Sequence, residues 1–341
     1  MAEFDAKKAE ELEEKYDSGL HTRALGPWIL RFTLAFSVIF AAYHYITAGI
    51  GVPIDYWHMG IHMSGVILLV FIGFPMIKGD HAWELQPNKW WRYANVPIWD
   101  WMLILAGISA SLYIGITWYE IDFTFLGQRF HLAEQVLRQG DPAAIDVVFG
   151  TVLILVLLEA VRRTLGIVVP IIIISFTVFA VFGKYMPLQV LKHPGINWAQ
   201  YINNMYFPAE GIFGITLWIV STVVFHFVLF GVLAQRMGLG QFFVDMATVI
   251  AGRYTGGLAK VSVVSSAFFG TISGSSIANT VSTGSLTIPN MKRMGYPGHL
   301  AGGVEAAASA GGQITPPIMG AAAFIMAEFL EVPYTTIIIA A

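Results

Sequence analysis

Long uncharged stretches limit the fold of this chain before any other feature does. About 20 apolar residues in a helix are enough to cross the hydrocarbon core of a bilayer. Five stretches of 19 to 25 residues reach this length without a charged side chain: Phe32–Ile54, Tyr56–Ile77, Trp101–Tyr119, Thr164–Gly183 and Gly211–Gln235. A sixth, Ile145–Val161, has an acidic residue near each end and forms a helical hairpin with the stretch that follows it. The sequence therefore predicts an all-α integral membrane protein with several spans.

The composition excludes several other classes of protein. Charged residues make up 12% of the 341 residues, against about 25% in soluble proteins, so polar groups cannot cover a globular surface. The absence of cysteine excludes disulfide frameworks, iron–sulfur clusters and thiolate zinc sites. A net charge of −3 without a basic stripe argues against a nucleic-acid partner. The partner that this composition indicates is the lipid bilayer.

The positions of the basic residues predict the topology. With the N-terminus in the cytoplasm, fifteen of the 19 Lys and Arg residues fall in cytoplasmic segments and four fall outside. This positive-inside bias requires all six spans, and it makes residues 1–26 a charged cytoplasmic segment. Two stretches are typical of interfacial helices: Leu239–Ile250 on the cytoplasmic side, where apolar residues recur at helical spacing, and Gly195–Glu210 on the outside.

Val261–Met291 is a run of 31 uncharged residues that does not fit a single span. As one helix it would be about 46 Å long, well beyond a hydrocarbon core of about 30 Å. Lys260 precedes the run and Lys292 follows it, so both ends belong on the same side of the membrane. Its middle, Thr271–Ser276, is poor in helix-forming residues. We therefore predict a re-entrant helical hairpin over residues 260–292, with its turn near the midplane.

The turn of this hairpin has the chemistry of a binding site. Backbone polar groups at membrane depth are tolerated only inside protein or beside a water-filled cavity. Twelve of the 31 residues are Ser or Thr, and hydroxyl, carbonyl and amide oxygens suit a hard cation such as sodium. The helix N-terminus near Ser275 suits a carboxylate. The residues expected to bind cation or substrate are Ser273, Gly274, Ser275, Ser276, Asn279 and Thr280. The alternative is that the small residues, including the Gly270/Gly274 pair, only allow close helix packing.

The segment Glu305–Glu331 is the second irregular stretch. Its Ala-rich helix is interrupted at Gly311–Pro317 and resumes after Pro317. Proline removes a backbone donor and disfavours helical geometry in the residue before it, so carbonyl oxygens and a new helix N-terminus become available. We predict a discontinuous helix over residues 298–331. Its expected binding residues are Gln313, Thr315 and Pro316. The alternative is a proline kink that serves packing alone.

Other titratable residues are candidates for other roles. Glu305 and Glu328 lie towards opposite ends of the discontinuous helix, and either could carry a coupling proton if it is buried, or lie at an interface. His58 and His62 have the i,i+4 spacing of metal ligands, but no third ligand is evident. Gly270–Gly274 lacks the spacing of a G-x-S-x-G nucleophile turn and has no evident base. We therefore expect a chain that is not an enzyme.

Two of these segments resemble a known family. GTISGSSIANTVSTGSLTIPNMKRMGYP (270–297) and EAAASAGGQITPPIMGAAAFIMAEFLEVPY (305–334) are similar to the fused permeases of tripartite ATP-independent periplasmic (TRAP) transporters, in particular the group that works with TAXI-type binding proteins. The similarity extends to DVVFGTVLILVLLEAVRRTLGIVVP (146–170) and EGIFGITL (210–217). It covers most of the chain after about Trp28.

The resemblance implies an elevator-type secondary transporter of a bacterial or archaeal inner membrane. Residues 27–190 would be its small-subunit-like region, and 195–341 the N-terminal half of its large-subunit-like transport region. The coupling ion would be sodium or a proton, and a TAXI-type periplasmic binding protein would deliver a small organic acid. The sodium ligands that the resemblance implies are Ser273, Gly274, Ser275, Ser276, Asn279 and Thr315.

The resemblance also implies a second inverted repeat, which this chain does not contain. The sequence stops at residues 335–341, inside a new hydrophobic stretch, so we expect a fragment or a permease whose other half is a separate chain. Three alternatives stay open at this point. They are a hairpin-type anion symporter that needs no binding protein, a membrane scaffold subunit that does not transport, and an intramembrane enzyme.

Overall fold

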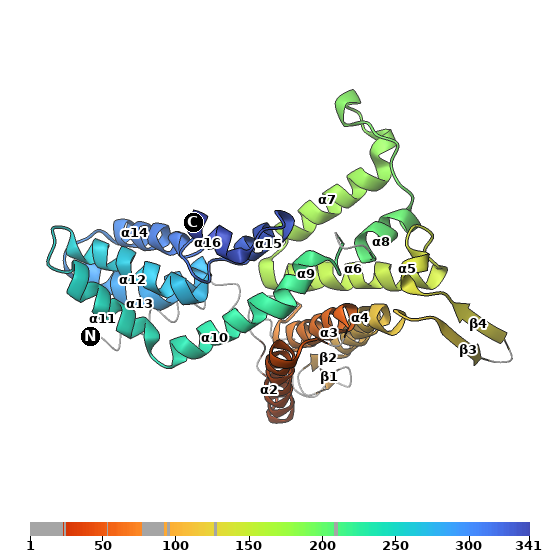
Figure 1. Ribbon diagram of the computed structural model, residues 1–341, viewed down its shortest axis with the longest axis horizontal. Coiled ribbons are helices and arrows are strands. Elements are labelled where there is room, and N and C mark those ends of the chain that lie inside the picture. The colour runs from red at the N-terminus through yellow and green to blue at the C-terminus, as the bar shows by residue number, and fades with distance from the viewer. Residues whose placement is uncertain are drawn as a thin grey trace. The chain divides into compact units, whose positions relative to one another are not determined.

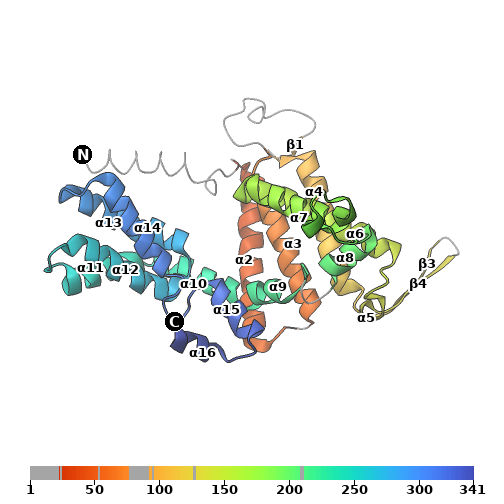
Figure 2. The same cartoon turned by 90° about the horizontal axis from the view of Figure 1, so that it is seen from above.

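The protein is a helical chain that divides into two compact units, Met1–Leu217 and Trp218–Ala341. The computed structural model describes residues 23, 25–52, 54–76, 92–93, 96–125, 128–207 and 211–341. Most of the predicted N-terminal segment 1–26 therefore lies outside the described residues. The elements of each unit can be followed in Figures 1 and 2.

Long helices dominate the first unit. They are α2 (Pro27–Ile50), α3 (Asp55–Gly73), α4 (Ile98–Ile116), α6 (Ala144–Leu165) and α7 (Val168–Phe182). Shorter helical pieces are α5 (Gln135–Arg138), η1 (Gly183–Tyr185), η2 (Gln189–Leu191) and α8 (Trp198–Tyr206), and α9 (Ile215–Ile219) crosses the boundary between the units. Two small antiparallel hairpins, β1 (Arg92–Tyr93) with β2 (Val96–Pro97) and β3 (Ile121–Phe125) with β4 (Gln128–Leu132), were not predicted.

Helix α4 lies at the centre of this unit, because α3 packs along one side of it and α6 along another. The contact with α3 is close at Gly60, where an added Cβ would lie 2.7 Å from the carbonyl oxygen of Ser111. Helix α6 also packs against α8 and α7. Side chains between these helices are almost fully buried, among them Ile67, Phe71, Ile104, Ile114 and Leu153.

Buried ion pairs connect the helix ends of the first unit. Asp100 at the start of α4 accepts hydrogen bonds from Arg163 at 2.7 Å and from Arg23 at 2.6 Å. Asp146 at the start of α6 pairs with Arg138 at 3.0 Å and accepts a hydrogen bond from the Tyr113 hydroxyl at 2.6 Å. Because both carboxylates are fully buried, each one requires its arginine partner to offset the cost of desolvation.

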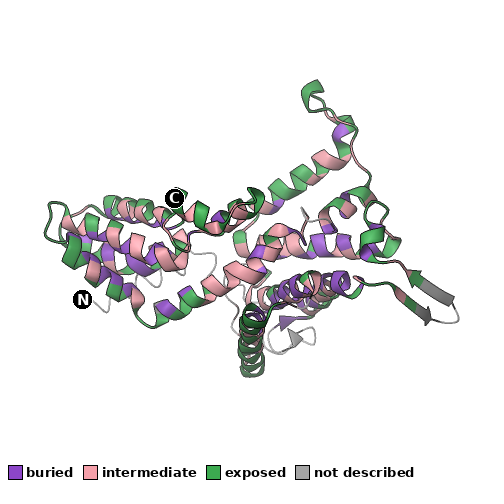
Figure 3. Ribbon diagram, in the orientation of Figure 1, coloured by how far each residue is buried: buried purple, intermediate pink, exposed green. Residues whose placement is uncertain are grey.

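Helices α2 and α7 of this unit are mostly exposed, and they are largely green in Figure 3. Their exposed side chains are large and apolar, as at Val38, Ile171 and Phe176. Hydroxyls on α7 return their hydrogen bonds to the preceding turn, as Ser175 and Thr177 do to the carbonyl oxygens four residues earlier. Such apolar faces suit contact with lipid.

The second unit is built around a helical hairpin. It begins with the π-helical turn η3 (Val220–Val224) and contains α10 (Phe225–Arg236), α11 (Leu239–Ala251), α12 (Gly257–Ser273), α13 (Ser276–Arg293), α14 (Gly298–Gly311), α15 (Ala321–Phe329) and α16 (Tyr334–Ala340). Helices α12 and α13 pack against each other, and α11 and α14 each contact both of them. Helices α15 and α16 meet at a bend of 118°.

Helix α11 is the predicted amphipathic helix, and it divides its apolar residues between two surroundings. Phe243, Val244 and Ala247 are buried on the side that packs on the hairpin. Phe242 and Val249 are exposed. The buried side belongs to a small core that also contains Ala251 and Val261, so only part of the apolar surface is available to a membrane interface.

The architecture confirms the predicted fold class. Within the described ranges, six helices are long and apolar enough to cross a membrane, and they coincide with the six predicted spans. The marginal sixth stretch is α6. The chain is thus a multi-pass, helical membrane protein.

Candidate functional site

The turn of the hairpin is only two residues long. Helix α12 ends at Ser273, and α13 begins at Ser276. Gly274 has φ of +59°, a left-handed conformation that glycine adopts without a steric penalty. Ser275 is the N-cap of α13, and its hydroxyl accepts a hydrogen bond from the backbone N–H of Ala278 at 3.3 Å. The turn therefore places the N-terminus of α13 directly after a glycine in the left-handed conformation.

The break of the discontinuous helix is longer than predicted. Helix α14 ends at Gly311, and α15 begins at Ala321 rather than directly after Pro317. The N–H of Gly320 donates to the carbonyl oxygen of Gln313 at 2.7 Å, which closes the loop on itself. This local bond keeps residues 314–319 out of helical geometry, so the prolines alone do not set where the helix resumes.

The hairpin turn and the break pack directly against each other. An added Cβ at Gly270 would lie 2.5 Å from the Cα of Gly312, and one at Gly274 would overlap the carbonyl oxygen of Met319. The side-chain amide of Gln313 donates to the hydroxyl of Ser276 at 3.0 Å. The glycines thus serve close packing, as the alternative interpretation held, and the same packing brings the expected binding residues together.

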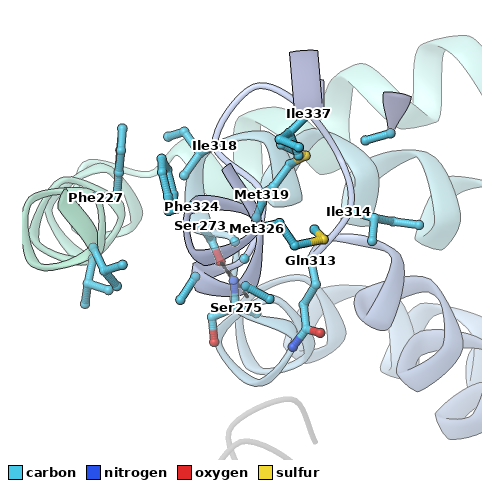
Figure 4. A pocket seen from close by; sticks show the side chains of 18 of the residues that line it. Phe227, Ser273, Ser275, Gln313, Ile314, Ile318, Met319, Phe324, Met326 and Ile337 are labelled. Carbon is cyan, nitrogen blue, oxygen red and sulfur yellow. Dashed lines mark hydrogen bonds between the residues drawn. The ribbon is translucent and has the colours of Figure 1, made fainter. Parts of the chain in front are cut away.

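A cavity of about 820 Å³ borders this contact. Its polar lining comes from the turn and the break, through Ser273, Ser275 and Gln313, and its apolar lining includes Phe227 and Phe324 (Figure 4). No Asp, Glu, Lys or Arg belongs to the lining among the residues that the structure describes. A cavity of this size, with few polar groups at one side, has the form of a small-molecule site.

Backbone oxygens add to the polar side of this site. A Cβ built on Gly320 would lie 3.3 Å from the carbonyl oxygen of Gly274 and 3.4 Å from that of Gln313. The hydroxyl of Ser273 donates to the carbonyl oxygen of Ser275 at 3.2 Å. Carbonyl and hydroxyl oxygens are the ligand types that hard cations prefer.

Three of the expected binding residues use their polar groups within the protein. Asn279 is fully buried, and its amide donates to the carbonyl oxygen of Ser266 at 2.9 Å. The Thr280 hydroxyl donates to Ser276 of its own helix at 2.8 Å. The Thr315 hydroxyl donates to the carbonyl oxygen of Gly311 at 2.9 Å. Pro316 lies in the break and is joined to Pro317 by a cis peptide bond.

Glu305 and Glu328, the two candidate carriers of a coupling proton, differ in their exposure to solvent. Glu328 lies on α15 and is exposed. Glu305 lies on α14 and is fully buried, where hydroxyl groups surround its carboxylate. The two residues therefore occupy opposite kinds of environment, and only Glu305 is enclosed by protein.

The sequence did not predict the residues that donate hydrogen bonds to Glu305, nor the backbone conformation of Met319, which packs against the hairpin turn. The hydroxyl partners are Ser262, Thr283, Thr287 and Ser309. A signal was present, because Thr283 and Thr287 are four residues apart, as are Glu305 and Ser309, so each pair shares a helix face. Met319, with φ of +58°, gave no sequence signal.

Histidines form a separate buried cluster in the first unit. His44 Nε2 lies 2.9 Å from His62 Nδ1, and Tyr43 bonds His58 Nδ1 at 3.1 Å. A different group has ligand atoms close enough together for a metal site. Among the described residues, this group is Glu120, Asp122 and His131, at the β3–β4 hairpin. His58 and His62 thus contact Tyr43 and His44 respectively.

Comparison with known sequences identifies relatives of the chain. Residues 152–341 match the family described as "Tripartite ATP-independent periplasmic transporter, DctM component". The C4-dicarboxylate TRAP transporter large permease protein DctM of Rhodobacter capsulatus is 34% identical over 91 residues, which are 27% of this chain and 21% of that protein. The isethionate TRAP transporter permease protein DctMQ of Oleidesulfovibrio alaskensis is 36% identical over 91 residues, 27% of this chain and 14% of that protein.

A third relative is the 2,3-diketo-L-gulonate TRAP transporter large permease protein YiaN of Escherichia coli, 34% identical over 100 residues. These are 29% of this chain and 23% of that protein. The chain thus matches less than a quarter of the length of each of these relatives. All three are named as transport permeases rather than enzymes. No solved structure matches the chain.

Proposed function

The chain belongs to the DctM component family of tripartite ATP-independent periplasmic transporters, and on that premise we propose that it is the permease part of a cation-coupled secondary transporter. The family match covers more than half of the chain. The observation that carries the proposal is the cavity where the hairpin turn meets the break of the discontinuous helix. Broken helices of this kind supply free backbone groups to transported ions and substrates.

The proposed substrate is a small organic acid. The three relatives are named for C4-dicarboxylates, isethionate and 2,3-diketo-L-gulonate, which are all organic anions. The cavity has no basic side chain among its described lining residues. The positive end of the α13 dipole, at Ser275 and Ser276, would therefore attract the carboxylate.

The proposed coupling ion is sodium or a proton. Sodium would be held by oxygen atoms of the turn and the break, and it would supply a positive charge next to the substrate carboxylate. The proposed ligands and neighbours are Ser273, Gly274, Ser275, Ser276, Asn279, Thr280, Gln313, Thr315 and Pro316. A coupling proton would reside on Glu305 or on Glu328.

The remaining parts of the proposal concern assembly. Residues 27–190 would act as the small-subunit-like region and 195–341 as half of the moving transport region of an elevator. A TAXI-type periplasmic binding protein would deliver the substrate, and a second half of the permease would complete the site. The N-terminus would face the cytoplasm of a bacterial or archaeal cell, with the protein in the inner membrane.

Uptake by the complete permease in proteoliposomes tests this proposal. The binding protein and labelled organic acids are supplied outside, and sodium and pH gradients are imposed separately. We expect uptake that needs both the binding protein and one of the two gradients. Uptake without the binding protein would support the symporter alternative. Unchanged uptake after Gln313→Ala and Asn279→Ala would support the scaffold alternative.

Cysteine labelling tests the topology, because the chain contains no cysteine of its own. A Ser275→Cys variant should react with a membrane-impermeant reagent from the cytoplasmic side in some transport states only. Leu188→Cys, at an exposed position between α7 and α8, is the control and should react from the periplasmic side in every state. Reaction of Ser275→Cys only from the periplasm would contradict the hairpin topology.

A further inference from the structure

Glu305 is enclosed by hydroxyl groups from three helices. Ser262 of α12 donates to its carboxylate at 2.6 Å, Thr283 and Thr287 of α13 each donate at 2.5 Å, and Ser309 of α14 donates at 3.1 Å. Its side chain also fits against Gly284, where an added Cβ would lie 2.9 Å from the Glu305 Cγ. Four donors thus meet the two oxygens of one fully buried carboxyl group.

No described basic residue forms an ion pair with this carboxyl group. The ionisable residues on the three surrounding helices all lie in a first or last turn: Lys260, Lys292, Arg293 and His299. Lys260 is directed at the ring of Tyr254, 5.6 Å from its centroid. A buried carboxylate without a cation depends wholly on its hydrogen bonds for the stability of its charge.

The hydroxyl groups can serve either protonation state of Glu305. Thr283 has one hydroxyl proton but three acceptors within reach, namely Glu305 Oε1 at 2.5 Å, the carbonyl oxygen of Asn279 at 2.8 Å and Asn279 Oδ1 at 3.2 Å. When Glu305 is ionised, Thr283 donates to it. When Glu305 is protonated, its O–H can donate to Thr283, whose own proton then turns to Asn279. The Thr283 hydroxyl therefore has a hydrogen-bond partner in both states.

Hydrogen bonds also lead from Glu305 towards the cavity. Ser309 lies one turn after Glu305 and accepts from Ser266 at 3.4 Å. The carbonyl oxygen of Ser266 in turn accepts from the amide of Asn279. That amide lies beside Gly312, because a Cβ on Gly312 would be 2.6 Å from Asn279 Nδ2. Gly312 directly precedes the cavity residue Gln313, so hydrogen bonds and then close packing connect Glu305 to the proposed binding site.

We propose that Glu305 is the residue that takes up and releases a proton in this protein, with its hydroxyl partners supporting both states. This inference rests on the proposed function and deepens it, since it selects Glu305 over Glu328 as the proton-carrying residue. The protonation state would bias the contact between α13 and α14, because the Thr283 hydroxyl, which joins these two helices, changes its direction of donation.

Infrared difference spectroscopy of the full chain in lipid bilayers tests this directly. The spectrum is recorded between alkaline and acidic buffer, where a carboxyl group that gains a proton gives a C=O stretching band that shifts in heavy water. We expect one such band from a buried group, its loss in Glu305→Gln, and a shift of its frequency in Thr283→Val. The band should persist in Glu328→Gln and in Asp245→Asn, which changes an exposed carboxylate on α11.

The Thr283→Val variant keeps the carboxyl group, so the test does not depend on whether Glu305→Gln folds. A spectrum in which the Glu305 band is absent throughout the pH range of the folded protein would overturn the inference. A band that disappears in Glu328→Gln would overturn it as well. Because this measurement involves no transport, a failure of binding-protein-dependent uptake would reject the proposed function without affecting the result for Glu305.

Discussion

Gly274 lies so close to Met319 that an added Cβ would overlap the Met319 carbonyl oxygen. At this point the hairpin turn and the break of the discontinuous helix touch through backbone atoms. Gly274 and Met319 both have positive φ, +59° and +58°, so each segment is held in a conformation that few residues adopt. This contact determines the polar side of the cavity.

The Gly274→Ala variant should lower the thermal stability of the protein and abolish uptake by the complete permease. The left-handed conformation alone costs about 1–2 kcal/mol for a residue with a Cβ, and the overlap with Met319 adds to this cost. Gly295→Ala is the matched control, because Gly295 has φ of +93° and open space around its Cβ position. Equal losses of stability in the two variants would show that the Met319 contact is unimportant.

Loss of Arg163 should destabilise the first unit strongly. The Arg163 guanidinium is fully buried and lies 2.7 Å from the buried Asp100 carboxylate. Its removal leaves a poorly compensated buried charge, which costs about 3–5 kcal/mol. We expect Arg163→Met to lower the unfolding midpoint measured in detergent by far more than Arg162→Met does, since the Arg162 side chain is 33% exposed. The double change Asp100→Asn with Arg163→Met should recover part of the loss.

Asn279→Ala should reduce stability even in buffer without sodium. The Asn279 amide donates to Ser266 at 2.9 Å, and its Oδ1 accepts from Thr283 at 3.2 Å. Leaving these buried partners unsatisfied costs about 1–3 kcal/mol. Thr280→Val is the control, because the Thr280 hydroxyl bonds only within its own helix at 2.8 Å. Normal stability of Asn279→Ala in sodium-free buffer, with a loss of stabilisation by sodium, would instead make Asn279 a cation ligand.

His131 should titrate above its ordinary pKa of 6.5. The hydrogen bond with Asp122 is the main cause of the raised pKa, and the charges of Asp122 and Glu120 add to it. The resulting stabilisation of the β3–β4 hairpin is present below the unfolded pKa and is lost as pH rises through the folded value. An NMR titration of the His131 ring should show a midpoint that falls towards 6.5 in Asp122→Asn, and falls less in Glu120→Gln. An unchanged midpoint in Asp122→Asn would contradict this assignment.

The positions of the irregular segments could be predicted because their causes are local. The length of Val261–Met291 and the lysines at its ends require a turn, and the structure places that turn at Gly274 and Ser275. Gly311 and the prolines end α14 as predicted. The point where the helix resumes could not be predicted, since it follows from a bond between Gly320 and Gln313.

The proposed binding residues show the same division between local and non-local causes. Ser273, Ser275 and Gln313 line the cavity, because they lie at the two breaks in helical structure. The roles of Thr280 and Thr315 were harder to anticipate, since a hydroxyl can bond its own helix or face outwards without any change in sequence.

The sequence by itself determined the membrane class, the spans, the hairpin and the break, because hydrocarbon thickness and backbone hydrogen bonding act on consecutive residues. Only the tertiary structure decided which glutamate is buried and which arginine partners Asp100. Glu305 meets Ser262 across 43 residues, and Asp100 meets Arg163 across 63 residues. Such pairs depend on which helix faces pack together, and the cost of desolvating a charge then requires a buried carboxylate to have partners.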